Sequence, residues 1–505
     1  MKKKIFCLFM VLTICIISLA ACSSNKKETP ADTDVNTSGD SAKTETVEKE
    51  DSSGTVAVED AKEDLAIERY QTSGKVVVAI NSGRSTDSYN LFANFNNYYP
   101  NIEIEQITYT GPTSEFLTAQ AAAGTMPDVV FDDASQIYYY VSQNWVMPLD
   151  DFVSEDEDFT YISQPIIDSY TYGGKLYALP MQAHFSSIFI NLDLLEELNM
   201  DLPETNWTPD DYVEFLKQGT TNEYSGTEIL WGIDEVFAGS MSPETSYYGY
   251  DMENHKFNTA KSWVDAVNLM VELRAYPGLE AWSLRNSNVD GDSNDYVKKF
   301  GNGNVGDIHM AFKMGKILTD PRGTWDVSWL KELTYKWTLW PWPQGEGAEG
   351  HLPMHVDNSW VVASTKNPEA SFEVVRYLTY SKEGNLERIA MYEEGDTDVN
   401  TLKEAFYIPT TNHPEVAERF KALESITEGI AYMYDSLGTS FRADLSKIIP
   451  GWEQVNNEYL SPRGNDVRDG IEDAASTAAE LDDVASKAIQ AYWNEFEEKL
   501  SAINK

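Results

Sequence analysis

The chain has 505 residues, with 82 acidic and 38 basic side chains and a formal net charge of −44. This charge disfavours nucleic acid and anionic membrane surfaces as partners, because both are bound through clustered lysine and arginine side chains. A core of the size that this length allows needs no disulfide or metal to hold it. The 13 tryptophans and 28 tyrosines are available both for the core and for stacking on a ligand.

The N-terminus has the pattern of a lipoprotein signal peptide. A lysine-rich start precedes a short apolar run over 5–20, and the sequence Leu-Ala-Ala-Cys that ends at Cys22 resembles a bacterial lipobox. We expect a signal peptide over 1–21 and lipid attachment at Cys22, which fixes the protein to the outer face of the cell membrane. The alternative is an ordinary signal peptide with a chance cysteine. Cleavage removes Cys7 and Cys15, so we expect no disulfide and no cysteine nucleophile.

Residues 22–72 are rich in serine, threonine, aspartate, glutamate and lysine and contain few bulky apolar side chains. Such a composition cannot bury enough apolar surface to fold by itself. It predicts a disordered acidic tether that joins the N-terminus to a folded body.

The body is expected to begin with alternating strands and helices. Apolar runs predict strands over 75–80, 102–110 and 129–131, and helical spacing predicts helices over 86–99, 113–123 and 138–141. This order predicts an α/β fold with a parallel sheet, whose ligands bind beyond the carboxyl ends of the strands. The turns over 81–85 and 132–135 are therefore candidate ligand loops. Capping of the following helix is the alternative role for Asp132 and Asp133.

Further signals mark helices downstream. Thr208 and Asn367 are expected N-caps, each followed by a proline at the first helical position. Apolar spacing from Ile471 onward predicts one or two amphipathic helices at the end of the chain. No repeat of fixed period is visible, which excludes solenoids and propellers.

Short motifs that suggest cofactor chemistry fail on their context. The GxGxxG match over 301–306 precedes an expected strand over 308–312, the reverse of the dinucleotide-binding order. The second match, over 345–350, carries two glutamates and is followed by no helix. An EF-hand-like loop around Asp290 has Val297 where a glutamate is required, so a solvated loop is favoured over a calcium site. We expect no cofactor, no metal and no enzymatic activity.

Three groups of motifs together resemble the family 1 extracellular solute-binding proteins of ABC importers, a family that includes the maltose-binding type. The groups lie at 99–104, 119–131 and 149–152; at 172–180, 188–195 and 206–209; and at 300–310, 340–343 and 357–378. Each motif alone is loose, and their order and spacing make the combination specific.

The resemblance implies a two-lobe periplasmic-binding-protein type II fold with a hinge and an interlobe ligand cleft. Lobe one is expected over 74–183 and 339–400, and lobe two over 186–337 and 402–500. Such a protein, expected to be a monomer, captures a carbohydrate and delivers it to the membrane permease of an ABC transporter. A ligand-sensing lipoprotein that signals to a membrane partner and a secreted glycan hydrolase are the alternatives.

The resemblance also implies a ligand site in which aromatic rings cover the apolar faces of a sugar and polar side chains satisfy its hydroxyl rim. Carried over by position, it comprises Asn81, Ser82, Arg84, Asp132, Asp133, Ser135, His184, Trp231, Tyr250, Lys313, Met314, Asp357, Asn358 and Trp452. His184 stands where the maltose-binding type has an acid, which argues for a different sugar. Trp452 is expected to stack on the ligand, and core packing is the alternative for each tryptophan.

Overall fold

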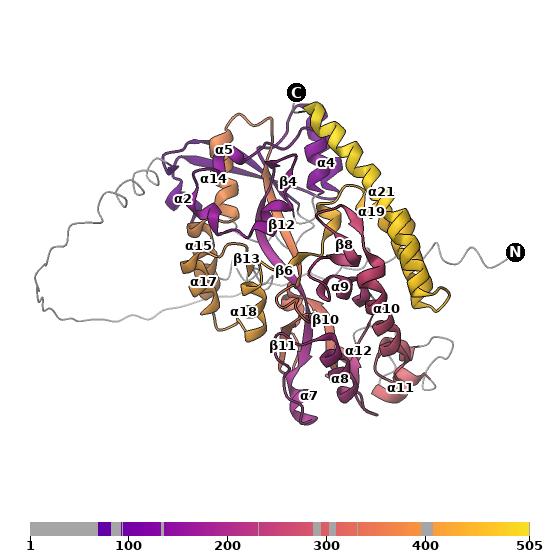
Figure 1. Cartoon of the computed structure of the whole chain (residues 1–505). Helices are drawn as coiled ribbons and strands as arrows, with labels where there is room; N and C mark the ends of the chain where they lie inside the picture. The colour runs from indigo at the N-terminus through magenta and orange to yellow at the C-terminus, as the bar shows by residue number, and fades with distance from the viewer. Residues whose placement is uncertain are drawn as a thin grey trace, which may run out of the picture. The chain divides into compact units, whose positions relative to one another are not determined.

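The computed structural model describes residues 69–81, 92, 94–132, 136–230, 232–285, 294–301, 310–330, 332–394 and 408–503. The chain divides into a unit over 1–60 and a unit over 61–505. All described residues belong to the second unit, which we call the body (Figure 1). The signal peptide, Cys22 and the candidate calcium loop at Asp290 lie outside the described residues, as do residues 302–306 of the first glycine motif.

The body begins with the predicted alternation of strands and helices. Its first elements are β1 (Gly74–Asn81), α2 (Phe95–Tyr98), β2 (Ile102–Tyr109), α3 (Thr113–Ala123), β3 (Val129–Asp132) and α4 (Ile137–Ser142). Strand β1 pairs in parallel with β2 on one side and with β3 on the other. Helix α3 ends at Gly124, whose φ of 70° is the left-handed conformation that glycine adopts without steric cost.

The first sheet is mixed rather than parallel. Its order is β2-β1-β3-β12-β6, with β12 (Pro353–Val361) antiparallel to both β3 and β6 (Leu179–Asn191). Two short strands extend it: β13 (Ile408–Pro409) pairs with β6, and β14 (Phe441–Arg442) pairs with β12. The predicted parallel arrangement is therefore correct for β1, β2 and β3, and β12, which comes late in the chain, joins these strands in the antiparallel direction.

The second sheet shares strand β6 with the first. The half of β6 that ends at Phe185 pairs with β12, and the half from Ser186 pairs with β10 (Ile317–Gly323) and β11 (Trp337–Pro341). Strand β7 (Ser225–Thr227) lies parallel to β10. A single strand of 13 residues thus passes from one sheet into the other.

Helices and turns cover both sheets. Between β3 and β7 they are α5 (Asp150–Val153), the 3-10 helix η2 (Glu157–Tyr161), α6 (Gln164–Asp168), the hairpin β4 (Thr171–Tyr172) with β5 (Lys175–Leu176), α7 (Leu192–Glu197) and α8 (Pro209–Gly219). Between β7 and β11 they are α9 (Ile233–Ser240), η3 (Tyr247–Gly249), the hairpin β8 (Tyr250–Asp251) with β9 (Lys256–Phe257), α10 (Thr259–Ala275), η4 (Trp282–Arg285), α11 (Asp295–Phe300), α12 (Met310–Lys313), η6 (Thr324–Asp326) and α13 (Val327–Leu330).

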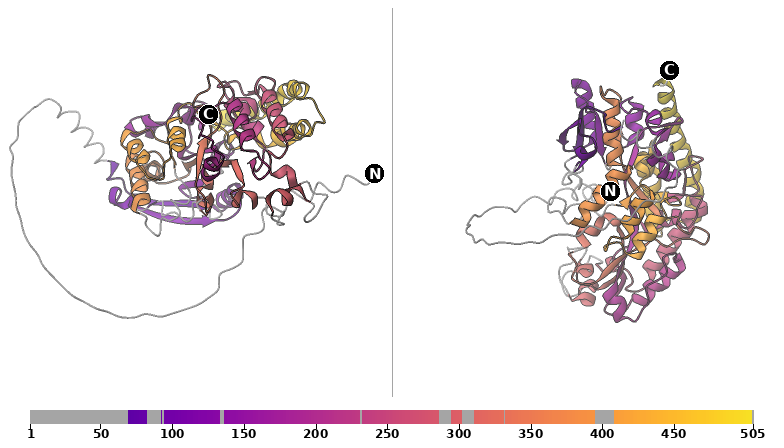
Figure 2. Two further views of the ribbon diagram at one scale, coloured as in Figure 1. Left: turned by 90° about the horizontal axis from the view of Figure 1, so that it is seen from below. Right: turned by 90° about the vertical axis from the view of Figure 1, so that its left-hand side faces the viewer.

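The C-terminal part adds α14 (Pro368–Leu378), α15 (Lys382–Glu394), α17 (Pro414–Lys421), α18 (Glu428–Asp435), η8 (Leu445–Lys447), α19 (Trp452–Val455), the π-helix η9 (Asn456–Leu460), α20 (Ser461–Arg468) and α21 (Ala474–Ile503). Helix α14 packs on β12, β1 and β3, whereas α21 packs on α10, α4 and β9. The predicted tail is one helix of 30 residues, coloured yellow along one side of the body in Figures 1 and 2. Among the described helices, none is long and apolar enough to span a membrane.

Two of the local predictions have different outcomes at the helix starts. Helix α8 opens with the predicted capping box between Thr208 and Asp211. Asn367 forms no side-chain cap of α14, and its side-chain amide instead donates to the carbonyl of Lys75 in β1 at 2.8 Å. The strand expected over 308–312 is also wrong where it is described: Met310 begins the short helix α12, which buries Phe312 against Phe189 of β6.

Candidate functional site

Several predicted site positions form a row across the first sheet. Asn81 and Asp132 end the parallel strands β1 and β3, and Asn358 of β12 lies opposite Asp132 in the antiparallel register. The Asn81 amide donates to the carbonyl of Gly111 at 3.0 Å. The structure describes the backbone of Asp132 and leaves its side chain outside the description. The polar row confirms that these strands end at a common edge, where α/β sheets bind ligands.

A cluster of polar side chains continues this row toward the second sheet. We call it the central cluster, and it consists of Gln182 and His184 of β6, His355 and Asp357 of β12, and Arg442, Asp444 and Lys447. The strand register places His184 opposite His355 and Gln182 opposite Asp357. Residues two apart on a strand share a face, so the four side chains from the two strands meet on one side of the sheet.

Ion pairs compensate the charges inside the central cluster. Asp357 pairs with Lys447 at 2.9 Å and accepts a hydrogen bond from the Gln182 amide at 2.8 Å. Asp444 pairs with Lys447 at 3.2 Å and with Arg442 at 2.7 Å. Burial raises the pKa of Asp357, but Lys447 and the other partners of this carboxylate together outweigh the effect, and the pKa lies below its usual value. Each ionised side chain of the cluster has a partner of opposite charge, an arrangement that suits an uncharged polar ligand.

Burial favours the neutral form of both histidines in the cluster. Burial lowers the pKa of His184 below its usual value and lowers that of His355 to about 4. The Nδ1 atom of His184 lies 3.3 Å from the hydroxyl of Thr324, and Nε2 of His355 lies 3.0 Å from the hydroxyl of Ser186. A neutral imidazole has one donor and one acceptor, which matches the hydrogen bonding of a hydroxyl group.

An exposed tryptophan lies beside the two histidines. Trp325, in η6 directly after β10, is a residue that is 43 % exposed. It stands edge-on to His355 with ring centroids 4.9 Å apart, and to His184 at 6.0 Å. It lies over Gly323, where a Cβ atom would overlap with the ring. The site therefore combines an open aromatic face from the second sheet with polar groups from the first.

Two residues predicted to face a ligand lie in the core instead. Trp452 is 4 % exposed and packs against Tyr250 and Phe257, with ring centroids 5.5 and 5.6 Å away. Tyr250 is fully buried, and its hydroxyl accepts a hydrogen bond from the indole of Trp493 in α21 at 3.1 Å. Helix α21 and the β8–β9 hairpin enclose both rings, so the structure corrects this part of the expected site.

The remaining predicted residues lie apart from the cluster or beyond the description. Lys313 and Met314 are exposed at the end of α12, which is a helix end and not the strand end that was expected. The residues outside the described part of the chain are Ser82, Arg84, Asp133, Ser135 and Trp231. Their place in the site stays a prediction.

Sequence reasoning missed several members of the site. Gln182 and His355 stand two residues from His184 and Asp357, so the alternation of strands was a usable signal for both. Trp325 and the segment from Arg442 to Lys447 reach the cluster only through tertiary packing, and no motif marks them. Among the described residues, no group of histidine, cysteine or acidic side chains has an arrangement that could hold a metal ion.

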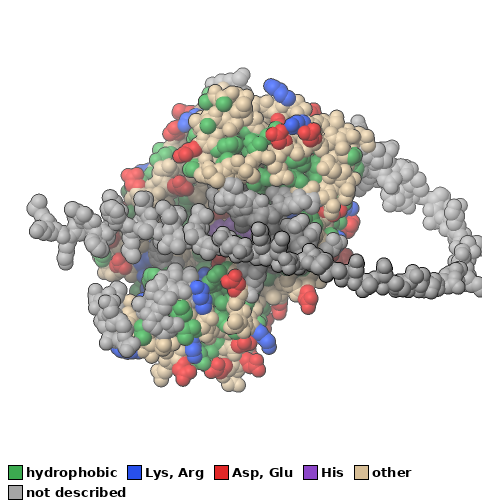
Figure 3. All heavy atoms as spheres, turned by 180° about the vertical axis from the view of Figure 1, so that it is seen from behind, with side chains coloured by type: hydrophobic (Ala, Val, Ile, Leu, Met, Phe, Trp, Pro, Cys, Tyr) green, Lys and Arg blue, Asp and Glu red, His purple; other side chains and the backbone are tan. Residues whose placement is uncertain are grey.

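The surface of the body shows no strong charge segregation on the face drawn in Figure 3. Acidic and basic side chains are interspersed among the described atoms, and a histidine is visible near the middle of this face.

Comparisons with known proteins find one family model and several similar structures. The family model described as bacterial extracellular solute-binding protein matches residues 90–397. The sugar-binding protein MalE from Xanthomonas citri has a similar structure, with a TM-score of 0.62 and 14 % identity over 84 % of this chain and 99 % of that chain. An ABC substrate-binding protein from Listeria monocytogenes in complex with cycloalternan has a TM-score of 0.60 and 16 % identity over 83 % and 99 % of the two chains.

A cyclo/maltodextrin-binding protein complexed with maltotetraose is similar too. Its TM-score is 0.59 and its identity 17 %, over 83 % of this chain and 97 % of that chain. At such identities the likeness shows the fold, and it confirms the predicted α/β class and the expected likeness to two-lobe periplasmic binding proteins.

Proposed function

Because the chain belongs to the bacterial extracellular solute-binding proteins, we propose that it captures an oligosaccharide outside the cell and delivers it to the permease of an ABC transporter. Proteins of the same fold bind cycloalternan and maltotetraose. The observation that carries the proposal is the exposed indole of Trp325 beside the charge-compensated central cluster. An indole covers the apolar face of a sugar ring, and neutral histidines, amides and ion-paired carboxylates satisfy its hydroxyl groups.

A thermal-shift screen identifies the ligand. The panel of oligosaccharides includes maltotetraose and cycloalternan. A ligand at about 100 times its dissociation constant stabilises the folded protein by about 2.7 kcal/mol. Replacing Trp325 with alanine removes the stacking surface, and the loss of a large apolar contact costs roughly 1–3 kcal/mol. We therefore expect calorimetry to show binding weakened by about tenfold to a hundredfold in Trp325→Ala.

The matched control for this variant is Tyr276→Ala. Tyr276 follows helix α10 and is 38 % exposed, so its replacement removes a comparable aromatic surface from another part of the body. Affinity should remain unchanged in Tyr276→Ala. Equal affinities in Trp325→Ala and the wild type would show that the ligand does not contact Trp325.

The shared strand β6 supports a hinge between the two proposed lobes. It is the strand that passes from the first sheet to the second between Phe185 and Ser186. A ligand that contacts Trp325 from one sheet and the central cluster from the other stabilises a closed form by its differential affinity. Small-angle scattering at saturating ligand should therefore give a smaller radius of gyration. An unchanged radius of gyration would contradict closure. The boundaries of the two lobes, given above from the resemblance, stay a proposal.

Lipid attachment at Cys22 is proposed from the lipobox-like sequence that ends there. Replacing Cys22 with alanine removes the acylated thiol, so the protein should appear in the medium or remain unprocessed. Fractionation and mass spectrometry of the expressed protein test this. Membrane-bound Cys22→Ala protein at the mature mass would show that the anchor lies elsewhere.

A sensing lipoprotein that passes ligand occupancy to a membrane partner is the second candidate function. It would use the same fold and the same ligand site, so binding measurements do not separate the two functions. Crosslinking of the ligand-bound protein in membranes distinguishes them, because import requires contact with a transporter permease.

A further inference from the structure

The chain enters the body through two residues whose side chains contact distant segments. Arg69 lies ahead of β1, with Nη1 3.3 Å from a carboxylate oxygen of Asp156 and Nε 3.1 Å from one of Glu373. The ring of Tyr70 lies edge-on to that of Tyr99, with centroids 5.3 Å apart. Both residues fall within the range predicted as a disordered tether. The structure corrects that prediction at its C-terminal end, because these contacts order the last residues of the range.

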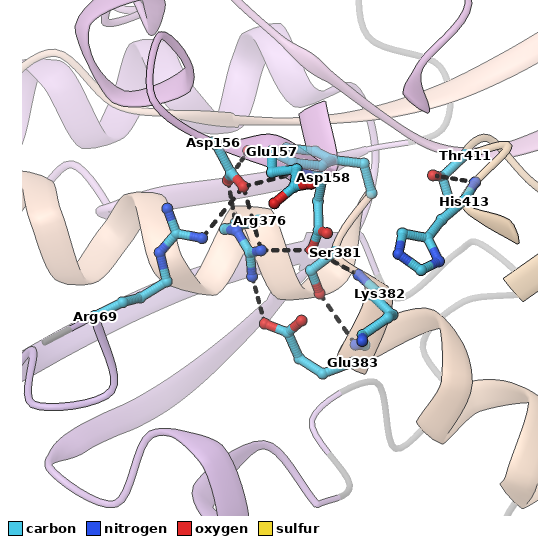
Figure 4. A network of polar contacts seen from close by, with 12 residues as sticks. Arg69, Asp156, Glu157, Asp158, Arg376, Ser381, Lys382, Glu383, Thr411 and His413 are labelled. Carbon is cyan, nitrogen blue, oxygen red and sulfur yellow. Dashed lines mark hydrogen bonds and ion pairs between the residues drawn. The ribbon is translucent and has the colours of Figure 1, made fainter. Parts of the chain in front are cut away.

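The carboxylates that form ion pairs with Arg69 belong to a buried ion-pair cluster centred on Arg376 of α14, shown in Figure 4. Arg376 donates to Asp156 at 2.6 Å, to Asp158 at 2.5 Å and to Glu383. The hydroxyl of Tyr380 donates to Asp156 at 2.7 Å. These groups come from η2, α14 and the start of α15, and Arg69 adds a contact from a fourth segment, at the N-terminal end of the body.

This cluster holds more negative than positive charge. Asp156, Asp158 and Glu383 contact Arg376. Glu373 contacts Arg69, which supplies the second cation. Glu373 is the carboxylate for which Arg69 matters most, because its ion pair with Arg69 is supplemented only by a hydrogen bond from the Tyr99 hydroxyl at 2.8 Å among the contacts described. Without Arg69 a buried carboxylate would lose its nearest charge partner, which is costly in a low-dielectric interior.

The contacts of Arg69 lie close along the chain to the start of strand β1. It is hydrogen-bonded on both sides, to β2 and to β3, and it begins only five residues after Arg69. Any opening that starts in the chain upstream reaches β1 unless the intervening residues are held. We propose that Arg69 and Tyr70 form a clasp that closes the N-terminal junction of the body, so that β1 does not fray and the backbone after Tyr70 is not cleaved by proteases.

Breaking the clasp should expose the junction without unfolding the body. In the full chain, Arg69→Gln should increase the rate of chymotryptic cleavage after Tyr70 by about tenfold to a hundredfold, since a charged hydrogen-bonded contact is lost. Hydrogen exchange of a peptide that covers residues 69–81 should accelerate by a similar factor. Cleavage rates of wild type and variant in concentrated urea control for any change in the intrinsic susceptibility of the sequence.

The matched control is Arg463→Gln. Arg463 also contacts two carboxylates, Glu472 at 2.7 Å and Glu480 at 3.0 Å, and its side chain is 27 % exposed against 24 % for Arg69. Junction cleavage should stay at the wild-type rate in Arg463→Gln. The clasp is refuted if both variants accelerate cleavage equally, or if Arg69→Gln leaves both readouts unchanged. The test involves neither ligand nor lipid, so its outcome is independent of the proposed function.

Discussion

Replacing Arg376 with glutamine should lower the free energy of unfolding of the body by about 3–5 kcal/mol, the usual cost of breaking a buried ion pair from one side. Arg376 is 4 % exposed, and its guanidinium contacts Asp156, Asp158 and Glu383. Glutamine keeps an amide NH2 group as a donor but removes the charge, so these carboxylates would remain buried beside one another. Urea denaturation followed by circular dichroism measures the loss.

The pH dependence of this loss has a definite sign. Burial is the largest single effect and raises the pKa of Asp156, but Arg376, Arg69 and the Tyr380 hydroxyl together outweigh it, and the folded-state pKa lies below the usual value. A carboxylate with a lowered pKa stabilises the folded state above its unfolded pKa, and this contribution is lost as the pH falls through the folded pKa. The difference between wild type and Arg376→Gln should therefore be largest near neutral pH and shrink in acid.

The control for Arg376→Gln is Arg419→Gln. Arg419 pairs with Glu393 at 2.6 Å, but both side chains are about two-fifths exposed, at 40 % and 41 %. An exposed ion pair contributes about 0–1 kcal/mol, so this variant should unfold almost as the wild type does. Similar losses in the two variants would mean that burial of the Arg376 cluster contributes nothing specific.

Local signals in the sequence were sufficient to predict helices whose ends are set by interactions between nearby residues. Helix α3 was predicted over its observed bounds, because Gly124 ends it in the left-handed conformation. Helix α8 was predicted from the capping box at Thr208, whose hydrogen bonds close within one turn. In each case the deciding interaction joins residues a few positions apart, and the sequence displays such spacings directly.

Strand pairings and hydrogen bonds between residues far apart in the sequence could not be predicted from local signals. Strand β12 enters the first sheet antiparallel between β3 and β6, although more than 160 residues separate it from either strand along the chain. Asn367 has the residue type of an N-cap, but its amide is taken by the carbonyl of Lys75. A cap and a long-range hydrogen bond compete for the same side chain, and only the packed structure decides between them.

The candidate site likewise contains residues that were predicted from the sequence and residues that only the folded structure brings together. His184 and Asp357 were predicted through the resemblance, and strand register brings them together as neighbours of Gln182 and His355. Trp325 carries the open aromatic face, yet it stands in a turn without any motif. Its exposure follows from the position of η6 at the end of β10. Strand β10 lies beside β6 only in the folded state.

Replacing Trp452 with alanine should lower the free energy of unfolding by about 3–5 kcal/mol, the typical cost of removing a large buried aromatic side chain. The indole packs against Tyr250, Phe257 and Tyr247, with centroid separations of 5.5, 5.6 and 6.3 Å. These rings come from the β8–β9 hairpin and η3, so a cavity at Trp452 would weaken several contacts at once. Denaturation of the unliganded protein measures the effect.

Trp325→Ala is the matched control, because it removes the same side chain from a position that is 43 % rather than 4 % exposed. It should reduce stability by less than about 1 kcal/mol, while its effect falls on ligand binding. Trp452→Ala should show the opposite division, with lower stability and unchanged affinity in the fraction that remains folded. If Trp452→Ala instead leaves stability intact and weakens binding, the ring faces the ligand as the resemblance implied, and the core assignment is wrong.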